Sequence, residues 1–154
     1  MRGKPAPKRP INPDPKFQRL DIAKLINKIM ERGKKTTAQK VVYGAFEHIS
    51  KKTKQDPIAI YDAAIRNISP NLEVKGKRIG GANYQVPIVV TGDRKMTLAH
   101  RWLIEAAKAR KGASMAVRLG EELIAAAGGE GAAMKKREDV QRMAESNKAF
   151  AHFA

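Results

Sequence analysis

The 154-residue sequence contains no cysteine, which excludes disulfide bonds, thiolate metal ligands and cysteine nucleophiles. No apolar run approaches the ~20 residues of a membrane-spanning helix, and the N-terminal segment MRGKPAPKRPINPDP lacks the apolar stretch of a signal peptide. Acidic residues are scarce as well: 15 Asp and Glu stand against 31 Lys and Arg, so the formal net charge is +16. Repulsion on this scale opposes a compact state unless an anionic partner neutralises it. We therefore expect an intracellular, strongly basic globular protein that binds nucleic acid and contacts no membrane.

Side-chain arrangements that support catalysis or metal binding are also missing. The histidines His48, His100 and His152 stand at unrelated positions, so we expect ordinary helix or surface residues and no metal site. The adjacent acidic residues at 121–122 and 138–139 point about 100° apart on a helix and are predicted to be solvated charges. No serine lies in a nucleophile elbow, and GGEGAAMKK lacks the Ser or Thr that follows the lysine of a phosphate-binding loop. We therefore expect no enzymatic activity, no cofactor and no small-molecule substrate.

The first 16 residues form a basic, proline-rich segment. They hold five of the eight prolines of the chain, and four cations precede the first acidic residue, Asp14. This composition predicts an extended arm that becomes ordered on binding, as basic N-terminal arms of nucleic-acid-binding proteins do. A solubilising tail is the alternative. We accordingly divide the chain into an arm (1–16) and a helical domain (17–154).

Apolar periodicity predicts three helices in the first half of the chain. LDIAKLINKIMERG repeats apolar residues at three- and four-residue spacing, and Gly33 follows where a left-handed C-cap is expected. A second helix, capped by Thr36 or Thr37, has its apolar face between residues 41 and 49. The third begins at 56–57 with aspartate and proline, a capping residue followed by proline at the first helical position.

A change to a two-residue period predicts a β-hairpin at about residues 72–90. In LEVKGKR, inward Leu72 and Val74 alternate with outward Glu73, Lys75 and Lys77, which predicts the first strand. IGGAN is the expected turn, and the β-branched segment YQVPIVV is the expected second strand. Pro87 cannot donate a hydrogen bond to a neighbouring strand, so its strand should lie at an edge. An isolated two-stranded hairpin is marginally stable. Its base is therefore expected to pack on the helices while its tip projects.

Helical periodicity returns after residues 91–93 and predicts three more helices. In the fourth, Trp102 belongs to the apolar face, while cations occupy the remaining faces and the ends. The sixth begins at about Ala132, and Val140 and Met143 are expected to point inward. The predicted fold is mainly α: a single helical domain of about six helices with a protruding β-hairpin between the third and fourth helices.

Lysine and arginine form five clusters, and no other type of functional side chain is clustered in the sequence. Besides the hairpin, these are the arm (Arg2, Lys4, Lys8, Arg9), the turn after the first helix (Lys34, Lys35), the fourth helix and its end (Arg94, Lys95, Arg101, Lys108, Arg110, Lys111) and the start of the sixth helix (Lys135, Lys136, Arg137). A single charge cluster is commonly just a solvated face, but five clusters with few balancing acids favour binding of phosphates. The last cluster opposes the macrodipole of its helix, so helix stability does not explain it. Tyr84 and Trp102 can stack on exposed bases, and Trp102 is equally well explained as a core residue.

Four long segments carry a resemblance to a known family. KLINKIMERGKK, ANYQVPIVV, AHRWLIEAAKAR and GAAMKKREDVQRMAESNKAFAHF resemble, in this order, the bacterial-type small-subunit ribosomal protein seven, and the resemblance extends over residues 13–153. It implies a helical domain with a hairpin after the third helix. It also implies a cytoplasmic protein of the small ribosomal subunit that binds rRNA early and nucleates assembly of the head domain. Such a protein would lie at the subunit interface near the tRNA exit site and the mRNA exit path, beside ribosomal proteins nine and eleven.

The same resemblance assigns roles to positions of this chain. The basic residues of the turn after the first helix and of the fourth helix would face rRNA, and the arm would thread into it. The hairpin tip and the C-terminal tail would approach exit-site tRNA through Lys75, Lys77, Arg78, Gly80, Gly81, Asn83, Tyr84, Lys148, Phe150 and Phe153.

Two other classes of protein were weighed against this interpretation. A nucleoid-type DNA-binding protein is also small and basic and can carry a hairpin, and competition between folded rRNA and duplex DNA distinguishes the two. An RNA-modifying enzyme would need a cofactor loop or a catalytic acid and base, neither of which the sequence contains.

Overall fold

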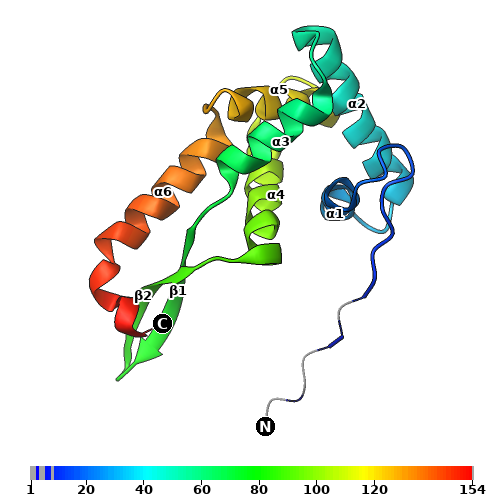
Figure 1. Ribbon diagram of the computed structural model, residues 1–154. Helices are drawn as coiled ribbons and strands as arrows, with labels where there is room; N and C mark the ends of the chain where they lie inside the picture. The colour runs from blue at the N-terminus through cyan, green and yellow to red at the C-terminus, as the bar shows by residue number, and fades with distance from the viewer. Residues whose placement is uncertain (1–2, 4–5, 8, 154) are drawn as a thin grey trace.

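In the part of the chain that the structure describes, the main elements are six α-helices and one β-hairpin (Figure 1). The computed structural model describes residues 3, 6–7 and 9–153. The elements are α1 (Leu20–Ile29), α2 (Lys35–Thr53), α3 (Pro57–Ile68), β1 (Leu72–Ile79), β2 (Ala82–Val89), α4 (Gly92–Ala109), α5 (Met115–Ala127), α6 (Ala132–Ser146) and a 3₁₀ helix, η1 (Lys148–Phe153). The hairpin lies between α3 and α4, which confirms the mainly α fold predicted from the sequence. The short helix η1 was not predicted from the sequence.

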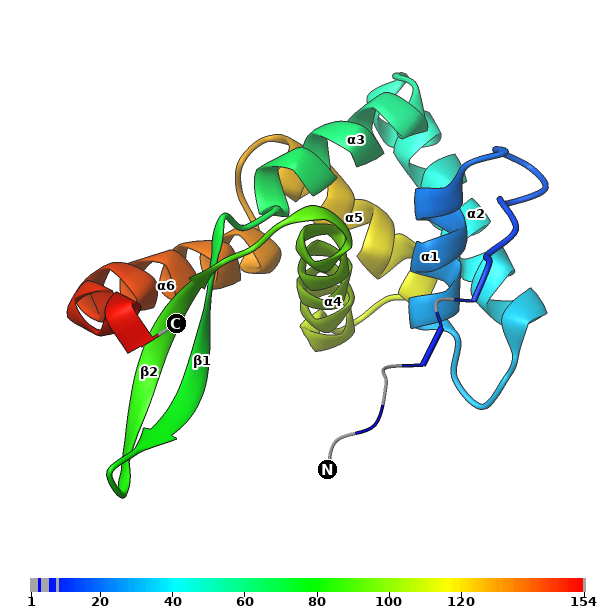
Figure 2. The same cartoon turned by 60° about the horizontal axis from the view of Figure 1, so that its bottom comes forward.

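Helix α5 runs through the helical body and packs against α2, α3 and α4 (Figure 2). Its Leu119 side chain is fully buried. Two glycines allow α2 and α5 to approach closely: a Cβ at Gly120 would lie 3.1 Å from the carbonyl oxygen of Ala45, and a Cβ at Gly44 would lie 3.2 Å from the Cβ of Ala116. Since interiors are close-packed, larger side chains here would force the two helices apart.

Three aromatic side chains of the helical body belong to the core. Trp102 is only 6% exposed, so of its two possible roles the structure supports the core one. Tyr61 is fully buried beside Phe46, with 5.8 Å between the ring centroids. Its hydroxyl lies 2.8 Å from Nε2 of His100, which is also fully buried. The burial of His100 was not predicted, because it depends on this contact between α3 and α4.

The turn between α1 and α2 differs from the predicted one. Helix α2 begins at Lys35, so Thr36 and Thr37 lie inside its first turn and neither is the N-cap. Arg32 and Gly33 both have left-handed backbone conformations, with φ of 52° and 74°. Two consecutive left-handed residues reverse the chain within this short turn, after α1 has already ended. Gly33 is therefore part of the turn and does not cap α1.

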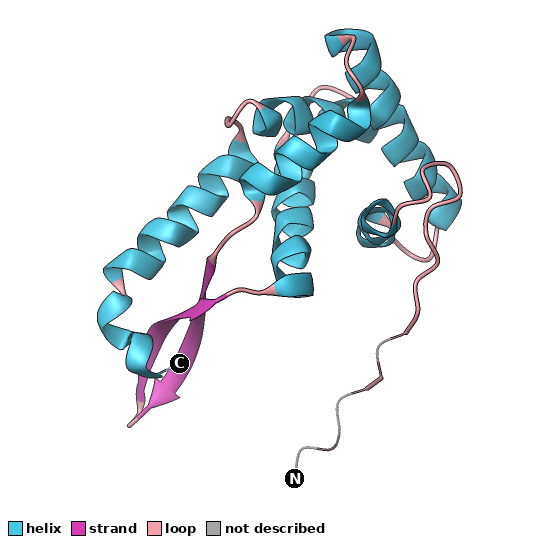
Figure 3. Ribbon diagram, viewed as in Figure 1, coloured by secondary structure: helices cyan, strands magenta, loops and turns pink. Residues whose placement is uncertain are grey.

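The hairpin projects from the helical body, and α6 lies along it (Figures 1 and 3). Its closing pair is Ile79 and Ala82, which flank a two-residue turn at Gly80 and Gly81. Both glycines have positive φ, 58° and 90°, as the tight turns of two-residue hairpins require. The predicted turn position is confirmed.

Burial at the base of the hairpin differs from the predicted alternation. Glu73 was expected to point outward, but it is 6% exposed, whereas Val89 is 70% exposed. The reason is that the Glu73 carboxylate is held by two cations, with Lys75 Nζ at 2.9 Å and Arg94 Nε of α4 at 2.8 Å. Pro87 lies in a two-stranded sheet and therefore on an edge, as predicted.

The start of α6 is held by a buried carboxylate of α5. Glu122 was predicted to be a solvated charge, but it is fully buried. Its Oε1 accepts a hydrogen bond from the backbone N–H of Ala133 at 2.9 Å, and its Oε2 accepts one from Arg110 Nε at 2.7 Å. Met143, predicted to point inward, is 46% exposed, while its neighbour Ala144 is buried. Helix α6 leaves the helical body along the hairpin, so only a narrow side of it is covered (Figure 3).

Candidate nucleic-acid interface

Helices α1 and α4 are in contact and together present a row of cations. Lys28 Nζ of α1 donates a hydrogen bond to the carbonyl oxygen of Thr97 on α4 at 3.3 Å. Lys24 Nζ lies 2.9 Å from Oδ1 of Asp93 at the start of α4. We call the following residues the α1–α4 cationic face: Lys24, Lys28, Arg94, Arg101 and Lys108.

The positive charges of this face act on one another. Burial is the main cause that lowers the pKa of the Lys28 amine, and the charges of Arg101 and Arg94 lower it further. An anion bound over the face would relieve this repulsion. The sequence analysis did not single out Lys24 and Lys28. The available signal was their position among the polar residues of an amphipathic helix, but the sequence does not show that this side of α1 meets α4.

Three of the predicted rRNA-binding cations also hold acidic side chains. The pairs are Arg94–Glu73, Lys108–Glu31 and Arg110–Glu122. Burial alone would raise the pKa of Glu73, but hydrogen bonds from Arg94 and Lys75 outweigh it, so the pKa lies below its ordinary value. Glu73 is therefore ionised at neutral pH, and its carboxylate orients Arg94. The Arg94 and Lys108 side chains remain about half exposed, so they are still accessible to a partner.

The base of the hairpin brings together cations from α4 and α6. Lys95 Nζ donates a hydrogen bond to Oδ1 of Asn71, just before β1, at 2.8 Å. Asn71 also lines a small cavity of about 150 Å³ together with Arg137 of α6. Lys135 and Lys136 are exposed on the same helix. The fourth-helix and sixth-helix clusters of the sequence thus approach each other through Lys95 and Arg137.

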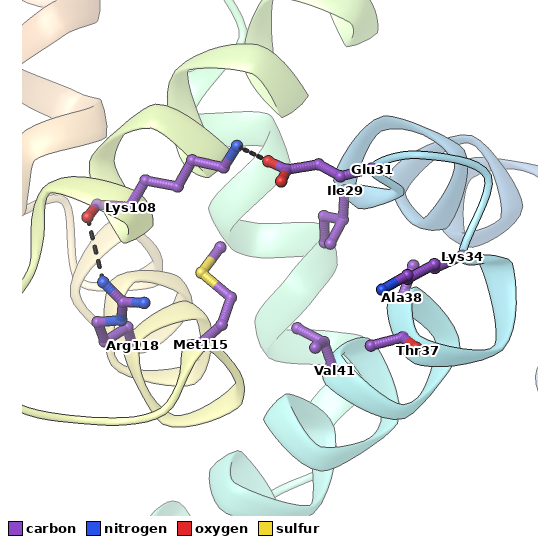
Figure 4. Close-up of a pocket in the computed structure, with 9 residues that line it drawn as sticks. All are labelled: Ile29, Glu31, Lys34, Thr37, Ala38, Val41, Lys108, Met115 and Arg118. Carbon is purple, nitrogen blue, oxygen red and sulfur yellow. Dashed lines mark hydrogen bonds and ion pairs between the residues drawn. The ribbon is translucent and has the colours of Figure 1, made fainter.

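The turn cluster lies at the other end of α4. Lys34 and Lys35 are both exposed between α1 and α2. Lys34 and Lys108 border one groove, which lies among the end of α1, the start of α2, the end of α4 and the start of α5 (Figure 4). Lys111 is exposed in the loop that follows α4. The structure therefore joins the turn cluster to the C-terminal part of α4.

Only part of the predicted arm can be placed. Arg2, Lys4 and Lys8 lie outside the described residues. Arg9 is exposed in a stretch without helix or strand. The chain joins the helical body at Asp14, which is 3% exposed. Its carboxylate accepts a hydrogen bond from the Tyr43 hydroxyl at 2.8 Å and others from two backbone N–H groups.

The hairpin and the C-terminal tail form one unit. Tyr84 packs against two tail rings, with centroid distances of 5.1 Å to Phe150 and 5.6 Å to Phe153. Lys77 Nζ donates a hydrogen bond to the carbonyl oxygen of Phe153 at 2.5 Å. The exposed predicted residues of this unit are Lys75, Lys77, Arg78, Gly80, Gly81, Asn83 and Lys148. The two segments predicted to approach tRNA are therefore side by side, and the Tyr84 ring is partly covered by the tail.

Two further kinds of site are absent from the described part of the chain. Within it, no group of three or more His, Asp or Glu residues is arranged to hold a metal ion. None of its helices is long and apolar enough to cross a membrane.

Comparisons with known proteins give concordant matches over nearly the whole chain. The family described as Ribosomal protein S7p/S5e matches residues 1–148. The Small ribosomal subunit protein uS7 of Azoarcus sp. (strain BH72) is 55% identical over 152 residues, which cover 99% of this chain and 97% of that protein. Proteins of the same name from Polynucleobacter necessarius subsp. necessarius (strain STIR1) and Paraburkholderia xenovorans (strain LB400) match with the same identity and coverage.

Proposed function

The chain belongs to the ribosomal protein S7p/S5e family, and from this premise we propose that it binds small-subunit rRNA directly through the α1–α4 cationic face. It is a structural constituent of the small ribosomal subunit and not an enzyme, and its partners are rRNA and other ribosomal proteins. It acts in the cytoplasm as part of that subunit. The proposal concerns the surfaces that it uses there.

One observation carries the rRNA-binding proposal: Lys24 and Lys28 of α1 both contact α4, at Asp93 and at the Thr97 carbonyl oxygen, so the cations of the two helices lie together in one row. Each phosphate neutralised by such a row releases counterions, which makes binding favourable at moderate salt. The turn cluster at Lys34 and Lys35 extends the face at one end, and Lys95 extends it at the other. Contacts of this type fix the position of a protein on RNA without reading its sequence.

We also propose that the protein is a primary rRNA binder that nucleates assembly of the head. Cations on the α1–α4 face, on the hairpin and on α6 lie on separate elements (Figure 2), so they can hold several rRNA segments in one arrangement. The resemblance to ribosomal protein seven supports a place near the mRNA exit path with ribosomal proteins nine and eleven as neighbours. In this proposal the arm (1–16) threads into rRNA while residues 17–154 form the RNA-binding domain.

A third part of the proposal is that the hairpin and the tail contact exit-site tRNA. The hairpin projects beyond the helical body and carries exposed Lys77 and Arg78 near its tip. The contact of Tyr84 with the tail rings brings Lys148 toward the same region. A narrow basic hairpin with the tail packed on one side can contact the phosphate backbone of a second RNA.

Filter binding to an rRNA fragment that spans the head tests the main proposal. If about six to eight phosphates are neutralised, log affinity should fall with log salt at a slope of roughly −4 to −7. Replacing Arg101 by Ala should weaken binding and reduce the slope by about one. Replacing Arg66, an exposed cation on α3, is the matched control and should change neither quantity. A flat salt response, or equal effects of the two replacements, would contradict the proposed face.

Duplex DNA serves as the competitor in the same assay. An rRNA binder should be displaced by unlabelled rRNA fragment at far lower concentration than by duplex DNA of equal nucleotide content. Equal competition by the two nucleic acids would favour the nucleoid-type alternative.

A further inference from the structure

The groove shown in Figure 4 has an apolar floor that none of the described residues covers. It has a volume of about 380 Å³, within the usual range of ligand-binding clefts. The floor is formed by Ile29, Ala38, Val41 and Met115, which come from α1, α2 and α5 (Figure 4). No described residue fills the space above them. Apolar side chains that line an open cleft bordered by a few polar groups are typical of ligand-binding sites.

The rim of the groove is cationic. Lys34, Lys108 and Arg118 border it, and the one acidic residue at the rim, Glu31, is paired with Lys108 (Figure 4). Lys35 is exposed beside it. A partner that fits must therefore combine a flat or compact apolar part with negative charge. An apolar peptide segment supplies only the first of these, whereas a nucleotide supplies both.

Arg118 is held in a fixed orientation at the groove. Its Nη1 donates hydrogen bonds to the carbonyl oxygens of Lys108 and Arg110, at 3.2 and 2.7 Å, at the C-terminal end of α4. A guanidinium group fixed in this way loses little side-chain entropy when a partner binds. Unstacked RNA bases lie on arginine guanidinium planes, and extruded bases are also held between apolar side chains.

We propose that this groove binds one unpaired nucleotide of rRNA, with its base on the apolar floor and its phosphate at the cationic rim. The inference rests on the proposed rRNA-binding function and names a specific subsite of it. Lys108 belongs both to the α1–α4 cationic face and to the rim of the groove. The two surfaces are therefore continuous, and one RNA strand can contact both. Phosphate contacts along the face position the RNA, and the groove adds a contact that requires an unpaired base.

Two neighbouring threonines offer a matched pair of variants. Thr37 lines the groove, whereas Thr36 does not, and both are exposed in the first turn of α2. Thr37→Trp places a large side chain at the groove, and Thr36→Trp adds the same side chain outside it. Thermal melting of both variants establishes that they fold.

Filter binding to the head rRNA fragment is the first measurement. Thr37→Trp should weaken binding at least about 5-fold, the lower end of the range for loss of a base stacked on an aromatic ring, because the floor is aliphatic, while Thr36→Trp stays within about twofold of the wild type. The salt slope should fall by about one in Thr37→Trp, because the phosphate of the displaced nucleotide leaves the cationic rim, and it should be unchanged in Thr36→Trp. Probing with dimethyl sulfate and kethoxal should show a base that wild type and Thr36→Trp protect and Thr37→Trp leaves reactive. Equal affinities of the two variants would overturn the nucleotide site while leaving the proposed function intact. Failure of the wild type to bind the fragment would overturn both.

Crosslinking decides the question without any groove-filling variant. With photo-methionine in place of methionine, the peptide that contains Met115 should crosslink to an rRNA nucleotide in assembled small subunits. A crosslink from this peptide to another ribosomal protein, or the absence of any crosslink to rRNA, would overturn the proposal.

Discussion

The Glu122 carboxylate of α5 accepts a hydrogen bond from the backbone N–H of Ala133, in the first turn of α6, at 2.9 Å. The first N–H groups of a helix have no acceptor within that helix, so a side chain of the preceding helix supplies the missing cap. The negative charge also lies at the positive end of the α6 macrodipole. Gly131, the N-cap residue, makes room for this contact, since a Cβ there would lie 2.8 Å from Oε1 of Glu122. Through this contact the helix that lies along the hairpin is anchored to the core.

Replacing Glu122 by Ala should therefore destabilise the protein. The loss leaves the Ala133 N–H and the Arg110 guanidinium without their acceptor, which should lower the free energy of unfolding by about 1–3 kcal/mol. Urea denaturation of the purified protein measures the difference. The control is Glu121→Ala, which removes a partly exposed carboxylate held by His48 and Lys52 and should cost at most about 1 kcal/mol. Equal losses at the two positions would contradict the capping role.

The buried His100 should make stability depend on pH. Burial, followed by the charge of Lys28, lowers the pKa of His100 to about 4 from an ordinary value of 6.5. Below pH ~6.5 the unfolded chain binds a proton that the folded chain does not, so stability present above that pH is lost progressively as the pH falls to about 4. The loss should be on the order of 2–3 kcal/mol.

Denaturation of wild type and His100→Gln between pH 7.5 and 4 tests this prediction. The variant should lose the His100 contribution to the pH dependence, whatever its absolute stability. His152→Gln, at an exposed position on η1, is the control and should keep the dependence of the wild type. An unchanged slope in His100→Gln would show that other groups are responsible.

Local signals explain which elements could be predicted from the sequence. Asp56 caps α3 as expected, because its carboxylate accepts from the Ile58 N–H two residues away. The hairpin turn depends on Gly80 and Gly81 alone. In contrast, the 3₁₀ helix η1 packs on Tyr84 of β2, more than sixty residues earlier in the chain. Contacts over that separation leave no periodic pattern in either segment.

The same distinction applies to the candidate interface. The cation clusters could be located from the sequence because they are contiguous, but their arrangement depends on how α1 meets α4. Lys28 was therefore missed, although its Nζ lies 3.3 Å from the Thr97 carbonyl oxygen. The burial of Glu73 was missed for the same reason, since Arg94 on a later element pairs with it. The groove at Met115 is formed where four elements meet and has no sequence signature at all.

The hairpin can be shortened without disturbing its contact with the tail. Lys77 pairs with Tyr84 across the two strands, and these two residues make the contacts with Phe153. The tip beyond this pair comprises residues 78–83, which are exposed apart from the half-buried Ile79. Replacing residues 78–83 by Asn-Gly, a favoured two-residue turn, keeps Lys77 and Tyr84 as the closing pair.

The shortened protein allows rRNA binding and tRNA contact to be tested independently. Because the α1–α4 cationic face is untouched, its affinity for the head rRNA fragment should stay within about tenfold of the wild type, or ~1.4 kcal/mol, and it should enter small subunits normally. Exit-site tRNA should dissociate faster from these subunits, because the exposed cation Arg78 and the backbone of the turn are gone. Tyr84→Ala is the matched control: it retains the tip but removes the ring that packs against Phe150 and Phe153, so its effect separates the contribution of Tyr84 and the tail from that of the tip. Failure of the shortened protein to enter subunits would make the hairpin an assembly element, and normal entry with unchanged tRNA dissociation would refute the proposed tRNA contact.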